Sequence, residues 1–290
     1  MQFCKPRQFF SALGKFTPMF ELPGLDDLFP ISHEMQRQYQ DDGYIMLREV
    51  CSPRELAPYA EAIRETVFNR AAGMKPMEER DTYGKAFVQI INLWQMNQRV
   101  AKFVLAKRFA QIAADLMGVP AVRLYHDQAL FKEPHGGHTP WHQDQFYWPL
   151  NGAKTITMWM PLVHVPAEMM AMKFARASHH HGPFNLTAIS DESEKYFSQL
   201  IAEKKFPIHQ IQEMAPGDAT FHSGWCLHGA PGNATDRMRE VMTIIYYEDG
   251  AVISEPEHEN RRNDMESFFP GQKPGELAAS HLNPRIYARE

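Results

Sequence analysis

Hydrophobic and polar positions follow two different periods along the chain, and the change falls near Gly118. Before it, apolar residues recur at helical spacing. Ser52 and Glu55 form a capping box that predicts a helix start. The apolar residues on one face of this helix are Leu56, Tyr59, Ala60, Ile63 and Val67. A second helix is predicted from about Gln98 to Met117, because Gly118 follows its last apolar residue.

After Gly118 the pattern changes to short runs typical of β-strands. The predicted strands are Val122–Phe131, Thr155–Val163, Met169–Phe174, Ile208–Gln212, Ala219–Leu227 and Glu240–Tyr247. A short amphipathic helix, around Ser190 to Glu203, interrupts them. Helices first and antiparallel strands afterwards predict an α+β protein that is mainly β, with a sandwich or barrel flanked by N-terminal helices.

The chain contains no stretch that reads as a linker between domains, so we expect a single domain over residues 1–290. Within it we expect an irregular N-terminal arm (1–32), a helical flank (about 33–118), a β core (about 119–250) and a C-terminal tail (251–290). The tail is rich in proline and glycine and is expected to wrap the core.

Composition narrows the class of protein. Hydrophobic residues make up 44% and charged residues 22%, which is typical of a globular chain. No apolar run approaches the ~18 residues of a membrane span. A formal charge of −5 argues against a nucleic-acid partner. Three scattered cysteines favour a reducing, cytoplasmic location, although residues 1–20 carry three basic and no acidic residues and are compatible with a transit peptide. The oligomeric state stays open.

The strongest chemical signal is a His-x-Asp sequence. His142 and Asp144 stand two apart on a predicted strand, so both are expected on one face with Gln143 pointing away. His228, at the end of a distant predicted strand, can complete the set. Two histidines and one carboxylate form a facial triad with open positions, which is typical of non-haem Fe(II) oxygenases. Taken alone, His-x-Asp is also compatible with an ordinary hydrogen-bonded strand histidine.

A basic residue follows the possible triad. Arg239 lies eleven residues after His228, at the start of the predicted strand Glu240–Tyr247, and the intervening turn is expected to let the two strands pair. A buried arginine can hold a carboxylate with two parallel hydrogen bonds. Iron and an arginine together suit a 2-oxo dicarboxylic acid, because its 2-oxo acid end can chelate the metal while its far carboxylate pairs with the guanidinium. Arg239 alone is also compatible with a charge on the surface of a strand.

These segments resemble the phytanoyl-CoA dioxygenase family. The similar segments are Thr139–Gln145 and His228–Asn233 with Arg239, and also Tyr125–Pro134 and Asp42–Ile45. The resemblance covers roughly residues 32–249. It implies a double-stranded β-helix core (jelly-roll, cupin-like), Fe(II) as the metal, and 2-oxoglutarate and O2 as co-substrates.

The resemblance also implies roles for particular residues. The residues that fall on the family's iron ligands are His142, Asp144 and His228. Arg239 falls on the residue that holds the C5 carboxylate of 2-oxoglutarate. The residues that fall where relatives line the co-substrate pocket are Gln128, Trp159 and Lys132.

One stretch departs from the family pattern. Where relatives carry a glycine and then Pro-Gly-Ser-His, this chain has Met170 for the first glycine and Arg176–Ala177 for Pro-Gly, while Ser178 and His179 remain. The geometry of this turn is therefore in question, but no iron ligand is affected.

The sequence thus predicts an Fe(II)/2-oxoglutarate dioxygenase that hydroxylates, or otherwise oxidises, an unactivated C–H bond of a small and partly apolar substrate, with release of succinate and CO2. The apolar residues that could wall its pocket are Trp94, Phe146, Tyr147, Trp148, Met158 and Met160. Two alternatives stay open: a catalytically inactive jelly-roll binding protein, and a cupin-like metalloenzyme that does not use 2-oxoglutarate.

Overall fold

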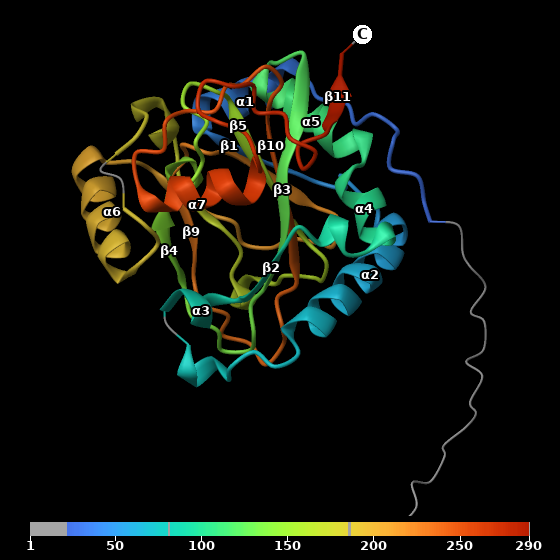
Figure 1. Cartoon of the computed structure of the whole chain (residues 1–290). Helices are drawn as coiled ribbons and strands as arrows, with labels where there is room; N and C mark the ends of the chain where they lie inside the picture. Colours follow the sequence, from blue (N-terminus) through green and yellow to red (C-terminus); the bar gives the residue numbers. More distant parts are fainter. Residues whose placement is uncertain (1–21, 81, 185–186, 290) are drawn as a thin grey trace, which may run out of the picture.

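Two antiparallel β-sheets form the centre of the protein, which is described by a computed structural model covering residues 22–80, 82–184 and 187–289 (Figure 1). The larger sheet has seven strands. In spatial order, six of them are β1 (Tyr44–Leu47), β8 (Ala219–Ser223), β5 (Thr155–Pro161), β10 (Val241–Glu248), β3 (Ala121–Phe131) and β11 (Arg285–Ala288). The seventh strand, β2 (Val88–Ile91), also pairs with β3.

The smaller sheet has four strands. They are, in spatial order, β4 (Thr139–His142), β9 (His228–Ala230), β6 (Lys173–Ala175) and β7 (Ile208–Gln210). The prediction of an α+β protein with antiparallel sheets is confirmed. The predicted strands differ from the observed ones at their ends, most in two cases: the run Ala219–Leu227 ends at Ser223, and the run Met169–Phe174 gives β6 only from Lys173.

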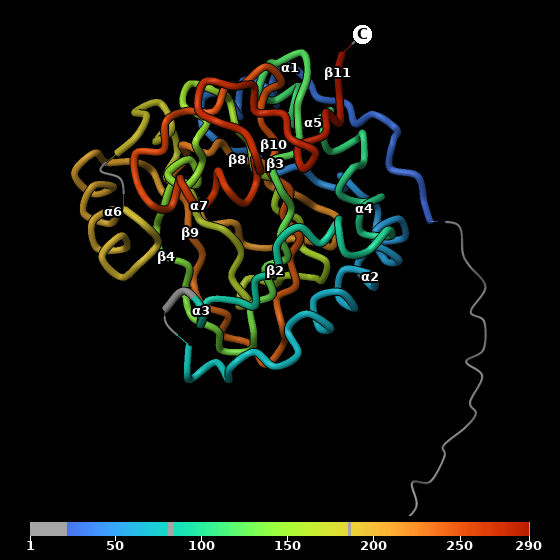
Figure 2. The backbone as a smooth tube through the Cα atoms, viewed as in Figure 1, coloured from blue at the N-terminus to red at the C-terminus, as the bar shows by residue number. Residues whose placement is uncertain are grey.

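Helices from the first part of the chain cover the larger sheet. They are α1 (His33–Asp42), α2 (Pro53–Ala71), α4 (Gln98–Val104) and α5 (Lys107–Met117), while the short α3 (Thr82–Ala86) lies between α2 and β2 along the chain. Figure 2 shows α2, α4 and α5 on one side of the molecule and α6 (Asp191–Lys204) on the other. The predicted capping box is confirmed: Ser52 Oγ accepts from the Glu55 backbone N–H, and a Glu55 carboxylate oxygen accepts from the Ser52 N–H. The predicted short helix is confirmed as α6.

The single helix predicted over 98–117 is wrong, because the chain breaks between α4 and α5. Ala106 has an extended backbone (ψ 129°), so α5 starts in a new direction. The break brings Phe103 and Phe109 together in an edge-to-face contact at 5.0 Å, and both rings are fully buried. Packing of the two apolar faces therefore outweighs the continuous helical pattern.

Both faces of the larger sheet are buried, and alternate residues along its strands face opposite sides. Along β5, Ile156, Met158 and Met160 belong to the core beneath the helices. The alternate residues Thr157 and Trp159 line an interior cavity on the other face. The expectation that Met158 and Met160 wall the pocket is therefore wrong, since strand alternation directs them to the helical side.

The C-terminal segment holds one helix that the sequence pattern did not indicate. This helix, α7 (Glu259–Phe268), has only two buried residues, Arg261 and Phe268. A helix that packs through so few residues gives almost no apolar periodicity. None of the described helices is both long and apolar enough to cross a membrane. The division into arm, flank, core and tail stays a prediction, and the possible transit peptide lies outside the described residues.

Candidate active site

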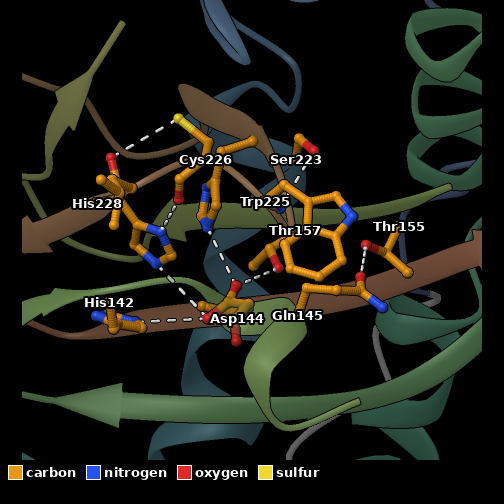
Figure 3. Close-up of polar contacts among 12 residues, drawn as sticks. His142, Asp144, Gln145, Thr155, Thr157, Ser223, Trp225, Cys226 and His228 are labelled. Carbon is orange, nitrogen blue, oxygen red and sulfur yellow. Dashed lines mark hydrogen bonds and ion pairs between the residues drawn. The ribbon is translucent and has the colours of Figure 1, made fainter. Parts of the chain in front are cut away.

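The three residues of the predicted triad lie together where the smaller sheet meets its neighbouring turn (Figure 3). His142 ends β4 and His228 begins β9, and the two are direct partners across the strand pair. The sequence predicts Asp144 on the same strand as His142. Instead, the strand ends first and Asp144 begins the 3-10 helix η3 (Asp144–Phe146). Its Oδ1 atom still lies 3.5 Å from His142 Nε2 and 3.6 Å from His228 Nε2. Gln143 points away, as predicted, toward the Gly182 and Trp225 carbonyls.

The backbone fixes which nitrogen of each histidine faces the carboxylate. His142 Nδ1 lies 2.8 Å from the Pro140 carbonyl, and His228 Nδ1 lies 2.9 Å from the Cys226 carbonyl. A carbonyl oxygen can only accept, so each Nδ1 donates its proton and each Nε2 keeps a free lone pair. Metal-binding histidines in proteins are commonly oriented in this way.

The ionisation states also suit a cation. Burial by itself would raise the pKa of Asp144, but His228, His142 and His222 outweigh it and hold that pKa well below its usual range. Burial, reinforced by His142 and His222, lowers the pKa of His228 well below its usual range. An ionised carboxylate and a neutral imidazole are the forms that bind metal ions. Two nitrogens and one oxygen, converging within 4.8 Å, fit a divalent metal with open positions.

A further histidine, which is not part of the predicted triad, lies against it. His222 on β8 places Nε2 3.4 Å from Asp144 Oδ2, and its ring centre lies 4.3 Å from that of His228. Its strand partner Thr157 donates a 2.9 Å hydrogen bond to the same Asp144 oxygen. His222 therefore joins Thr157 in surrounding the carboxylate oxygen that faces away from His142. Alternation along β8 directs His222 to the face opposite Phe221, but the sequence does not show that this face lies against Asp144.

Arg239 reaches the site by a different route from the expected one. The expectation that the strands of His228 and Arg239 pair is wrong: β9 pairs with β4 and β6, whereas β10 lies between β5 and β3. The chain crosses from one sheet to the other between them. Arg239 instead pairs its backbone with Lys132, immediately after the end of β3. The strand that carries His228, β9, has a partner on each side in the smaller sheet and is therefore not available to β10.

The guanidinium of Arg239 is buried and has unused donors. The residue is 3% exposed. Its Nη1 donates to the Met170 carbonyl, and Nε has no hydrogen-bond partner among the described residues. The guanidinium carbon lies 5.6 Å from the Trp159 ring centre. Burial lowers the pKa of Arg239 to about 10, so it stays charged at neutral pH. A buried cation with free donors is a ready site for an anion.

An interior cavity of about 180 Å³ connects these groups. The predicted residues that line it are His142, Asp144, His228, Arg239, Gln128 and Trp159. Lys132 is fully buried and is not part of the lining: its Nζ donates to the Gly137 carbonyl and lies 3.4 Å from Thr139 Oγ1. Burial lowers the pKa of Lys132 to about 6. Its contribution to co-substrate binding stays a prediction.

Two of the six apolar residues suggested as pocket walls, Tyr147 and Trp148, line the cavity, whereas Trp94, Phe146, Met158 and Met160 do not. The lining residues that the sequence interpretation missed include His126, Asp264 and Phe268. His126 carried a signal, because it stands two residues before Gln128 on the same face of β3. Asp264 and Phe268 come from α7, which the pattern did not indicate.

Four further histidines lie near the predicted ligands or in the turn at Ser178–His179, and they have ordinary surroundings. His135 and His138 are exposed, and His135 Nε2 lies 2.9 Å from Asp236. His179 and His180 lie 2.9 and 3.2 Å from the carbonyls of residues 40 and 41, near the end of α1. None of them lines the cavity.

The turn that departs from the family pattern keeps a backbone suited to glycine. Met170 has φ 59° and Ala177 has φ 61°, the region that side chains other than glycine rarely adopt. By the family resemblance, both positions are those where relatives carry glycine. The Met170 carbonyl in this turn accepts a hydrogen bond from Arg239.

Comparisons with known proteins identify the family of this chain. Residues 39–241 match the phytanoyl-CoA dioxygenase (PhyH) family, and the chain belongs to that family. A methylphosphonate hydroxylase from Gimesia maris is 25% identical over 211 residues, which cover 72% of this chain and 78% of the relative.

Solved structures share the fold. The non-haem α-ketoglutarate-dependent carbocyclase SnoK from nogalamycin biosynthesis has a TM-score of 0.71 at 23% identity, covering 89% of this chain and 97% of that one. The epimerase SnoN, crystallised with Fe3+, α-ketoglutarate and nogalamycin RO, has a TM-score of 0.69 at 24% identity, covering 88% of this chain and 98% of that one.

Proposed function

We propose that this protein is an Fe(II)/2-oxoglutarate-dependent dioxygenase that hydroxylates, or otherwise oxidises, an unactivated C–H bond of a small organic substrate. The observation that carries the proposal is one cavity holding both a convergent His142/Asp144/His228 set and a buried, partly unpaired Arg239. A metalloenzyme without an anionic co-substrate has no use for that arginine. We infer further that the two sheets form the family's double-stranded β-helix.

In this proposal, Nε2 of both histidines and a carboxylate oxygen of Asp144 would hold Fe(II). When bound, iron and 2-oxoglutarate would supply the oxidising chemistry, with O2 consumed and succinate and CO2 released. Arg239 would pair with the C5 carboxylate of 2-oxoglutarate. Gln128 and Trp159 would line the same end of the cavity, with Lys132 behind it.

The protein itself would position the metal ligands and limit the access of water to the site. Backbone carbonyls hold the two histidine rings, and Thr157 holds the second oxygen of Asp144. The cavity walls would limit the access of water to the reacting groups. At about 180 Å³, the cavity is small beside the ~300–1,000 Å³ of typical ligand pockets. The enclosed part of the substrate is therefore small.

The test is anaerobic titration of the apoprotein with Fe(II) and then 2-oxoglutarate. We expect a weak visible charge-transfer band that grows to one equivalent of 2-oxoglutarate. His228→Ala should lose the band while circular dichroism shows the fold retained, because two remaining ligands hold iron poorly. His138→Ala, an exposed histidine outside the cavity, is the matched control and should keep it. No band in the unmodified protein would refute the proposal.

A further inference from the structure

The cavity contains a carboxyl group that the proposed function does not use. Asp264 on α7 lines the cavity together with Phe268, one turn further along the same helix. Its Oδ2 atom accepts a 2.7 Å hydrogen bond from the Tyr125 hydroxyl. Burial raises the pKa of Asp264 to about 7, and no cation among the described residues offsets that burial. The carboxyl group is therefore poised for a positive partner that the described part of the chain does not supply.

The helix that carries Asp264 is fixed to the metal-binding turn. Arg261, three residues earlier on α7, is 1% exposed. It donates from Nη2 to the carbonyl of residue 145 (3.2 Å) and from Nε to the carbonyl of residue 146 (3.1 Å), within the turn that begins with Asp144. Its Nη1 also donates to Asn151 Oδ1 at 2.8 Å. These hydrogen bonds thus fix the position of Asp264 relative to the triad.

Uncharged rings line the same cavity as this carboxyl group. The Tyr125 ring, whose hydroxyl holds Asp264, lies 5.1 Å from Phe268 and 5.5 Å from Trp148. His126 stacks on Phe268 at 4.5 Å, and burial lowers the pKa of His126 to about 4, so it is neutral at pH 7. A carboxylate beside aromatic faces is a setting that stabilises organic cations.

The balance of charges in the site, with the metal and 2-oxoglutarate bound, also favours a cationic substrate. Apart from its histidines, the described lining carries Asp144, Arg239 and Asp264 as charged side chains. A divalent metal and Arg239 together offset Asp144 and the two carboxylates of 2-oxoglutarate. Asp264 is then left without a cationic partner, and a bound cation would stabilise its ionised form over the neutral acid that its raised pKa favours.

We propose, on the basis of the proposed function, that the substrate is a small organic amine whose ammonium group pairs with Asp264 and whose apolar part lies against Phe268 and Trp148. Asp264 and Phe268 lie beyond residues 39–241, the segment that matches the family. Substrate choice can therefore differ from that of relatives. A phosphonate would bring more negative charge to a cavity whose described lining has no lysine and no arginine other than Arg239.

The experiment measures binding to the complete protein loaded with Mn(II) and 2-oxoglutarate, by calorimetry, so that it does not depend on turnover. The probes share a phenyl group and differ in charge: phenethylamine, phenethyl alcohol and hydrocinnamate, with methylphosphonate as a fourth. We expect phenethylamine to bind at least about tenfold more tightly than the others, since a hydrogen bond to a charged group contributes ~1.5–3 kcal/mol.

Asp264→Asn keeps a carbonyl oxygen that can accept from the Tyr125 hydroxyl and removes the negative charge. It should weaken phenethylamine binding by about tenfold or more and leave phenethyl alcohol unchanged. Glu266→Gln makes the same charge change at an exposed position of α7 and should alter neither. Preference for hydrocinnamate or methylphosphonate, or equal binding by Asp264→Asn, would overturn the amine proposal. Failure of 2-oxoglutarate to bind the unmodified protein would instead overturn the proposed function.

Discussion

Arg239→Ala is the substitution that most directly tests the co-substrate site. The side chain is 3% exposed, and its Nε has no partner among the described residues. Removing one partner of a buried, hydrogen-bonded charge pair typically costs ~2–5 kcal/mol. At ~1.4 kcal/mol per decade, this corresponds to a loss of roughly 30-fold to several thousand-fold in 2-oxoglutarate affinity. Arg239→Lys should recover only part of it, because an ammonium cannot form two parallel hydrogen bonds.

The assay is calorimetric titration of 2-oxoglutarate in the presence of Mn(II) as an inert substitute for iron. Metal affinity itself should stay nearly unchanged, since Arg239 is not among the proposed ligands. Arg285→Ala, on β11 with a side chain 56% exposed, is the matched control and should bind normally. If Arg239→Ala retains the metal and loses less than about threefold in 2-oxoglutarate affinity, or ~0.65 kcal/mol, the reasoning fails.

Three further predictions follow from the geometry. Asp144→Ala should abolish substrate-dependent succinate release while circular dichroism stays native; normal hydroxylation would remove it from the triad. Met170→Gly and Ala177→Gly should each raise the free energy of unfolding in urea by ~0.5–1 kcal/mol, because each relieves a positive φ; unchanged stability would contradict this. Cys226, fully buried with its pKa raised to about 12 by burial, should resist iodoacetamide until the protein is unfolded, as peptide mass spectrometry would show.

Local features of this fold could be predicted from the sequence because their causes are local. The start of α2 depends on Ser52 and Glu55 alone, and it was predicted correctly. The alternation along β5 places Thr157 and Trp159 on one face whatever the rest of the chain does. The break between α4 and α5 could not be predicted, because it depends on the packing of two helices against each other and the sheet.

The same distinction holds for the site. The chain itself determined the candidate metal-binding set, since two histidines and a carboxylate are a characteristic combination wherever they converge. Only the tertiary structure decided that His222 lies beside Asp144, that Lys132 stays out of the cavity lining, and that α7 brings Asp264 into it. Residue identity sets which chemistry a side chain can perform, whereas its neighbours are set by contacts between segments far apart in the chain. A single sequence gives no local signal for those contacts.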